Sequence, residues 1–316
     1  MLLKPQKSLK TPVRCLIWGT GNEFLKELYL INYYEMVGAI EVYAITAAEH
    51  IYTHVGNYKF IEYKSLKMSN FDVVIVTTGN KKFTNEITET LHAMGVDDSR
   101  IIPIKVFSVL GFDINKYVRI KESVPSIFAP NCWGGITYNR LGLRFNSPLI
   151  NMWEEHDDYL KLIADPHRYF SYDLKFVGMG HDMNSKKDYP IARCGDILLH
   201  FNHYCTFEEA NSAWIRRKKR IDWNNVLVMF FHNDPNKIEE FIHLEYKHKI
   251  CFAPFDYNND CVLSLKQQSN KALSKKEFWE IVNGLGRGMY LYYDVFDLLL
   301  DGKITKYDIE FFIDDL

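Results

Sequence analysis

The residues with the most capacity for chemistry lie in four short polar segments, each directly after an apolar run that is typical of a β-strand. The segments are Asn131-Cys132-Trp133, Asn202-His203-Tyr204, His232-Asn233-Asp234 and Pro254-Phe255-Asp256. In an open parallel sheet, ligands bind outside the carboxyl ends of the strands, where such segments meet. We therefore expect one cleft lined by Cys132, His203 and Asp234. His200 and Arg217 are expected close behind it.

Cys132 is the candidate nucleophile of this cleft. It precedes two glycines and a predicted helix, so its sulfur would lie near helix N-terminal amides, which favour a thiolate. The alternatives are a bound water as nucleophile and a small, buried, apolar role for the cysteine. Asn131, Trp133 and Asn233 are expected to contact the ligand, with Trp133 either stacking on a sugar or lying in the core.

Two histidines are candidate general bases. His200 lies on the predicted strand 196–201 and His203 three residues beyond it, so the two can converge only if the chain turns after Phe201. A purely structural histidine is the alternative role for each. Asp234 completes the predicted catalytic set.

A run of basic residues, 216–220, ends the predicted helix 207–220. Cations at a helix C-terminus complement the helix dipole, so a solvated helix end explains most of them. Arg217 shares a face with Ala213 and Trp214, so we expect it to point inward, where it could hold a phosphate or a carboxylate. Because consecutive basic residues cover all sides of a helix, no nucleic-acid partner is predicted.

The sequence predicts neither a metal nor a cofactor. His181, Asp182 and His232 are possible metal ligands, but their spacing matches no standard pattern. The turn 18–22 (WGTGN) stands where a dinucleotide fingerprint would lie, yet Phe24 occupies the third glycine position. The second predicted strand also ends without an acid that could bind a ribose.

The elements that must position these residues alternate between strands and helices, which indicates parallel pairing and a doubly wound α/β fold. In the first half of the chain the expected strands are 13–18, 37–45, 72–77 and 100–106. In the second half they are 124–129, 196–201, 226–231 and 249–253, with helices at 134–141, 153–164, 207–220 and 235–247. The polar segment 171–190 is expected to be a long functional or mobile connection.

Length and composition favour two domains. A chain of 316 residues exceeds the size at which single cores stop growing, and the polar stretch before residue 125 is the natural boundary. We expect a degenerate Rossmann-like domain over 1–120 and a larger α/β domain over 121–316. With a formal charge of −2, no apolar run long enough to span a bilayer and no pattern typical of a signal peptide, the sequence predicts a cytoplasmic protein with reduced cysteines.

Two stretches carry a resemblance to a known family. Residues 129–149 (APNCWGGITYNRLGLRFNSPL) and 189–226 (YPIARCGDILLHFNHYCTFEEANSAWIRRKKRIDWNNV) closely resemble the signature blocks of a bacterial domain-of-unknown-function family. Members of that family are often labelled exopolysaccharide biosynthesis proteins, and some are labelled acetyltransferases. The resemblance implies a two-domain α/β architecture and a setting in surface polysaccharide assembly, and it carries over no catalytic residue.

The expected function is therefore a group transferase that acts on a saccharide or an activated sugar. The alternative is a non-catalytic protein of the same pathway that binds a glycan precursor or another protein. A metal-dependent hydrolase is a third, weaker hypothesis.

Overall fold

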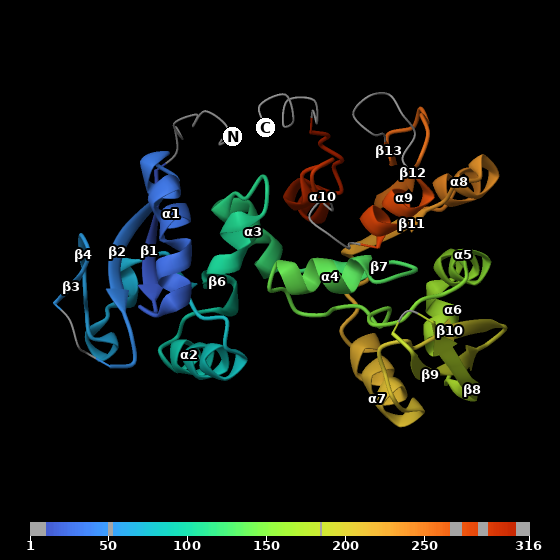
Figure 1. Cartoon of the computed structure of the whole chain (residues 1–316), viewed down its shortest axis with the longest axis horizontal. Coiled ribbons are helices and arrows are strands. Elements are labelled where there is room, and N and C mark those ends of the chain that lie inside the picture. Colours follow the sequence, from blue (N-terminus) through green and yellow to red (C-terminus); the bar gives the residue numbers. More distant parts are fainter. Residues whose placement is uncertain (1–10, 50–52, 184, 266–273, 284–289, 308–316) are drawn as a thin grey trace. The chain divides into compact units, whose positions relative to one another are not determined.

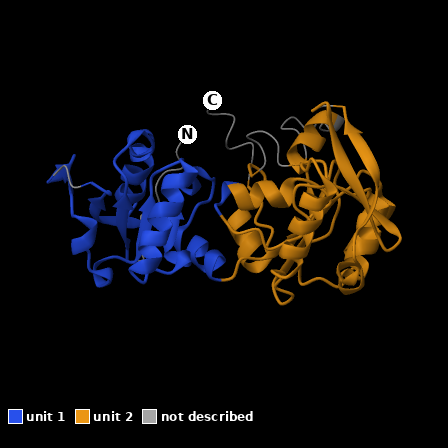
Figure 2. Ribbon diagram, turned by 90° about the horizontal axis from the view of Figure 1, so that it is seen from below, with its two compact units in different colours: residues 1–122, 140–142 blue, residues 123–139, 143–316 orange. Residues whose placement is uncertain are grey.

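A computed structural model describes residues 11–49, 53–183, 185–265, 274–283 and 290–307. The chain divides into two compact units, residues 1–122 with 140–142 and residues 123–139 with 143–316 (Figure 2). Each unit contains a parallel sheet, so the α/β class predicted from the sequence is confirmed. No helix in the described part of the chain is long and apolar enough to cross a membrane.

Unit 1 is built on a parallel sheet of order β2-β1-β5-β6 (Figure 1). Its strands are β1 (Val13–Trp18), β2 (Ile40–Thr46), β5 (Val73–Val76) and β6 (Ile101–Pro103), with a small hairpin of β3 (His54–Val55) and β4 (Tyr58–Lys59). Its α-helices are α1 (Asn22–Met36), α2 (Lys81–Ala93) and α3 (Ile114–Glu122). The apolar runs of β1 and β5 are buried, as expected for parallel strands covered on both faces. The predicted strand 100–106 is shorter than expected, because the chain turns into a 3₁₀ helix at Ile104.

The parallel sheet of unit 2 has the order β13-β12-β11-β7. Its strands are β7 (Ser126–Phe128), β11 (Val226–Phe231), β12 (His248–Ala253) and β13 (Val262–Ser264). β7 and β11 lie within predicted strands, β12 begins one residue before the predicted strand 249–253, and β13 was not predicted. The helices of unit 2 are α4 (Trp133–Arg140), α5 (His156–Ala164), α6 (Pro166–Ser171), α7 (Phe207–Lys218), α8 (Pro235–Ile242), α9 (Lys275–Val282) and α10 (Val295–Asp301).

A second, antiparallel sheet of order β10-β9-β8 corrects two predictions. The polar segment 171–190 is not a loop, because it contains β8 (Lys175–Asp182) and the start of β9 (Lys187–Cys194). It is polar because β8 is an edge strand that lies mostly in solvent. The predicted strand 196–201 is β10 (Ile197–His200), which pairs antiparallel with β9 and not with the parallel sheet. Gly195, with φ +62°, makes the tight hairpin turn that causes this pairing.

The loop 152–154 joins the two sheets of unit 2. The backbone N–H of Glu154 donates to the carbonyl of Pro130, just after β7. Trp153 exchanges two backbone hydrogen bonds with His200, at the end of β10. Both sheets contribute to a single hydrophobic core, which includes Phe128 and Leu199. The ends of β7 and β10 are therefore held together by one short loop.

Candidate functional site

A cavity of about 440 Å³ lies at the carboxyl edge of the parallel sheet of unit 2, and we call it the carboxyl-edge pocket. Phe231, the last residue of β11, contributes to its wall, and helix α9 lies beside that strand (Figure 1). The described residues that line it are Pro130, Asn131, Cys132, Trp153, Glu154, Glu155, His156, His181, Asp182, Met183, Tyr189, Asn202, Phe231, Trp279 and Asn283. The pocket thus collects segments from both sheets, from the loop between them and from α9.

Cys132 stands directly before the first residue of α4. The side chain of Asn131 fixes this turn, since its Oδ1 accepts a hydrogen bond from the Trp133 amide at 3.0 Å and its Nδ2 donates to the Val282 carbonyl at 3.0 Å. A Cβ atom on Gly134 would lie 3.1 Å from Ile127, so the glycine allows α4 to pack closely on β7. The turn is therefore well fixed, and the thiol lies at the wall of the pocket.

The structure brings Cys132 and His203 together. The sulfur lies 3.5 Å from Nε2 of His203, although the two residues are 71 positions apart in the sequence. His203 is exposed and follows β10, so the chain does turn after Phe201. This distance is suitable for proton transfer between a thiol and an imidazole.

The expected activation of the Cys132 thiol is not seen. Burial raises the pKa of Cys132, and the nearby Glu154 carboxylate raises it further. Desolvation disfavours the charged thiolate, so the stabilisation expected from the helix N-terminus is not the dominant effect on this pKa. Cys132 is therefore a protonated thiol at neutral pH.

Glu154 is the most unusual side chain of the pocket. It is only 3% exposed, and neither of its carboxyl oxygens has a hydrogen-bond partner. Burial raises its pKa to about 8, with a smaller contribution from the charge of Asp158, so the carboxyl is mostly protonated at pH 7. The sequence does not predict this residue as part of the site, because Glu154-Glu155 has the pattern of solvated acids near a helix start.

Residues 104–299, more than half of the chain, match the family described as Domain of unknown function (DUF1919). The protein belongs to this family. Residues 12–102 match a second family, described as C2185-like, N-terminal. The whole carboxyl-edge pocket lies inside the DUF1919 region.

Two individual proteins are similar to this chain. An uncharacterized protein of Haemophilus influenzae is 29% identical over 151 residues, which are 46% of this chain and 70% of that protein. The second is the crystal structure of aspartate semialdehyde dehydrogenase II complexed with ASA, from Vibrio cholerae, with 10% sequence identity. The match covers 69% of this chain and 68% of the dehydrogenase chain. Its TM-score of 0.25 is too low to support any argument about fold or function.

Asn202 lines the pocket, and His200 packs against the lining residue Trp153. The His200 ring stacks on Trp153, with centroids 4.0 Å apart and planes at 16°. Burial lowers the pKa of His200, and its Nδ1 has no hydrogen-bond partner. The buried Oδ1 of the lining residue Asn202 likewise has no hydrogen-bond partner. His203, and not His200, is the histidine in contact with Cys132.

His156 is a further pocket histidine that the sequence analysis missed. Its pKa is lowered to about 4 by burial first and then by His232, whose ring centroid is 4.8 Å away. It is therefore a neutral imidazole at pH 7. Among the residues that the structure describes, no three His, Cys, Asp or Glu side chains come together in an arrangement that could hold a metal ion.

Of the eight predicted site residues, Asn131 and Cys132 line the pocket, and the other six, His200 and His203 among them, do not. Asp234 caps α8, since its Oδ1 accepts hydrogen bonds from the backbone and side-chain nitrogens of Asn236 at 2.9 and 3.1 Å, and Asn233 beside it is exposed. Trp133 is fully buried, so neither face of its ring is available to a sugar. Arg217 is buried elsewhere, against Ile150 and Tyr204.

Arg217 points inward, as expected, but its partners belong to the protein. Its Nη1 donates to the carbonyl of Ile150 at 3.0 Å and to the hydroxyl of Tyr204 at 2.6 Å. The guanidinium also lies over the ring of Phe145, 5.4 Å from its centroid. These contacts give Arg217 a structural role in holding the loop before Trp153.

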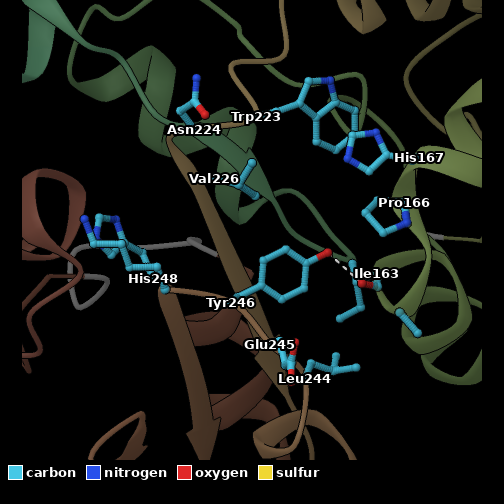
Figure 3. Close-up of a pocket in the computed structure, with 12 residues that line it drawn as sticks. Ile163, Pro166, His167, Trp223, Asn224, Val226, Leu244, Glu245, Tyr246 and His248 are labelled. Atoms are coloured by element: carbon cyan, nitrogen blue, oxygen red, sulfur yellow. Dashed lines mark hydrogen bonds between the residues drawn. The ribbon is translucent and has the colours of Figure 1, made fainter.

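A second cavity of about 340 Å³ lies at the opposite edge of the same sheet, and we call it the amino-edge pocket (Figure 3). Val226 and His248, the first residues of β11 and β12, line it. The hydroxyl of Tyr246 donates to the Ile163 carbonyl at 2.6 Å, and the His167 ring stacks on Trp223 with centroids 3.9 Å apart. Tyr246 and His167 are thus both engaged within the protein.

Proposed function

We propose that the protein is a group transferase that acts on a saccharide or an activated sugar, in the assembly of exopolysaccharide. In this proposal Cys132 is the nucleophile and His203 is its base. The observation that carries it is the 3.5 Å contact between Sγ and Nε2 at the wall of a pocket. The setting comes from the resemblance of residues 129–149 and 189–226 to exopolysaccharide biosynthesis proteins.

Transfer of an acyl group is the chemistry that this pair fits best. The sulfur of Cys132 attacks the carbonyl carbon of an acyl donor, and its proton passes to Nε2 of His203. The new S–C bond forms a thioester as the bond to the leaving group breaks, and His203 returns the proton to that group. A saccharide nucleophile then attacks the thioester, its proton passes to His203, and the S–C bond breaks. His203 finally reprotonates the released thiolate.

The raised pKa of Cys132 determines how this step runs. Because the resting thiol keeps its proton, the base must remove it during the attack, as in hydrolases with a serine nucleophile. The first turn of α4 supplies backbone N–H groups beside Cys132, and such groups stabilise an oxyanion at the attacked carbonyl. His203 is exposed and free to move toward the leaving group.

The test uses p-nitrophenyl acetate as a simple acyl donor. We expect a burst of p-nitrophenolate and one acetyl group on the peptide that contains Cys132. Cys132→Ala should abolish both, and His203→Gln should slow the burst by about 100-fold, the usual size of a general-base effect. Cys205→Ala is the matched control, because Cys205 is the exposed thiol of the same loop. Equal acetylation of Cys205 and Cys132 would contradict the proposal.

One observation favours the non-catalytic alternative, a glycan-binding protein. Trp279 of α9 lines the same pocket and is 49% exposed, and Tyr189 lies on the wall formed by β9. Aromatic rings of this kind give a sugar an apolar surface to stack on. Saccharide binding without any acetyl transfer to the bound sugar would support this alternative.

A further inference from the structure

Four buried polar atoms without partners gather at the carboxyl-edge pocket. They are both carboxyl oxygens of Glu154, Oδ1 of Asn202 and Nδ1 of His200. A buried polar atom that stays unpaired destabilises the folded state, so folded proteins rarely leave several together. Glu154 and Asn202 line the cavity directly, and His200 stacks on Trp153, which also lines it. This concentration indicates a ligand whose groups complete the missing hydrogen bonds.

The atoms define which groups the ligand presents. The Asn202 amide oxygen only accepts hydrogen bonds, and Glu154 becomes acceptor-only once it ionises, so a ligand rich in donors satisfies both. Glu155 and Asp182 add negative charge at the wall, and no Lys or Arg is present among the described residues that line the pocket. His156 adds no positive charge, because its pKa is about 4. A phosphate or carboxylate would be repelled here, whereas a cationic donor would be attracted.

We propose that the carboxyl-edge pocket binds an amino sugar through its protonated primary amine, with the Glu154 carboxylate as the counter-ion and Asn202 Oδ1 as a second acceptor. An ammonium group carries three donors, which suits a site that has several unfilled acceptors. Bringing a cation to Glu154 removes the reason for that carboxyl to hold its proton, so it ionises as the ligand binds. The exposed ring of Trp279 is available to the apolar face of the sugar.

The role of the amine in catalysis rests on the proposed function. The ammonium gives one proton to the Glu154 carboxylate, and the neutral amine attacks the carbonyl carbon of the Cys132 thioester. The N–C bond forms, the S–C bond breaks, and the second amine proton passes through His203 to the thiolate. The amide product has no charge, so it loses the ion pair with Glu154 and leaves. Glu154 is thus the group that distinguishes the acceptor from the product.

Equilibrium titration at pH 7 with four probes tests the binding claim. The cationic probe is methyl α-D-glucosaminide. The two neutral probes are methyl α-D-glucoside and methyl N-acetyl-α-D-glucosaminide, and the anionic probe is glucose 6-phosphate. We expect the cationic probe to bind at least about tenfold more tightly than the two neutral ones, and the phosphate to bind worst. Equal affinities for the cationic and neutral probes, or tightest binding of the phosphate, would overturn the inference.

Two variants assign the preference to Glu154. Glu154→Gln keeps the shape and should bring the cationic and neutral probes within about twofold of each other. Glu155→Gln removes a charge from an exposed neighbour in the same pocket, so most of the preference should remain. A preference that persists in Glu154→Gln, or that is lost equally in Glu155→Gln, would show that Glu154 is not the counter-ion.

Cys132→Ala separates this inference from the proposed function. The variant should bind the cationic probe as the unmodified protein does, because the amine site does not need the thiol. If the unmodified protein binds the amine but Cys132 is not acetylated, the amine site is supported and the transferase mechanism is contradicted. If Cys132 is acetylated but the protein does not bind the amine, the transferase mechanism is supported and the amino-sugar acceptor is contradicted.

Discussion

The two pockets at opposite edges of the parallel sheet in unit 2 are similar in size and different in chemistry. Their volumes are about 440 and 340 Å³. At the amino edge, Tyr246 and His167 are held by Ile163 and Trp223. At the carboxyl edge, Glu154 and Asn202 are buried with polar atoms that nothing in the described structure satisfies. Whether the polar atoms in a cavity wall have hydrogen-bond partners therefore says more about ligand binding than the presence of the cavity does.

Strand direction explains why the two edges differ. The turn that carries Cys132 leads from the carboxyl end of a strand into a helix N-terminus, where backbone N–H groups point toward the pocket edge of the sheet. At the amino edge a helix C-terminus is closed by packing, where Gly302 ends α10 against His248. The comparison predicts that changes at the carboxyl edge alter titration and reactivity, and that changes at the amino edge alter stability alone.

The largest expected effect is the pH dependence that Glu154 gives to stability. The pKa of Glu154 is raised from 4.5 to about 8 in the folded protein. Between pH 4.5 and pH 8, the folded state therefore keeps a proton that the unfolded state has lost. Its stabilising contribution is present below pH 4.5 and is lost as the pH rises toward 8. Relative to Glu154→Gln, the free energy of unfolding should fall by roughly 4 kcal/mol from pH 5 to pH 8.

Urea denaturation of both proteins at several pH values measures this difference. All other titrating groups are shared by the two proteins, so they largely cancel. Parallel pH curves for the two would show that Glu154 is solvated, and the contrast between the two pockets would then disappear.

The next effect concerns packing at the amino edge. Gly302 has φ +68°, and a Cβ atom there would lie 2.6 Å from the His248 ring. Gly302→Ala should therefore destabilise the protein by about 2 to 4 kcal/mol, from backbone strain together with overpacking. In a His248→Ala background, Gly302→Ala should lower the free energy of unfolding by less, because the imidazole ring that the new Cβ atom would contact is absent. An equal cost in both backgrounds would assign the whole effect to the backbone.

A smaller effect is expected on the reactivity of Cys132. Because its pKa is raised by burial and by Glu154, iodoacetamide should modify it about tenfold more slowly at pH 8 than it modifies the exposed Cys205. At pH 9, where Glu154 is ionised, Glu154→Gln should accelerate the modification of Cys132 several-fold and leave Cys205 unchanged. Peptide mass spectrometry over time measures both rates. Rapid labelling of Cys132 at pH 7 would restore the activated thiolate that the sequence predicts.

The smallest expected effect belongs to the amino-edge stack. His167→Ala removes a ring that stacks on Trp223, so stability should fall by less than about 1 kcal/mol. The affinity for methyl α-D-glucosaminide should not change, because the two pockets lie at opposite edges of the sheet. A loss of amine binding in this variant would contradict the assignment of separate roles.

The sequence alone determined the elements whose local pattern is unambiguous. The apolar runs at 13–18, 226–231 and 249–253 predict the strands β1, β11 and β12, and the turn at Cys132 leads into a helix as expected. Such signals are reliable because a buried parallel strand needs a continuous apolar run, and a helix start needs only nearby residues. The α/β class follows from these elements.

Only the tertiary structure decided which strands pair and which side chains meet in the pocket. The run that forms β10 has the same local pattern as β11, yet the Gly195 hairpin pairs it with β9 in a separate antiparallel sheet. That pairing brings His203 to Cys132, and the loop between the two sheets buries Glu154 beside them. A glutamate next to another glutamate has no local pattern that predicts burial. Its unusual pKa exists because distant segments exclude water from it, and long-range packing of this kind is not encoded in the residues next to it.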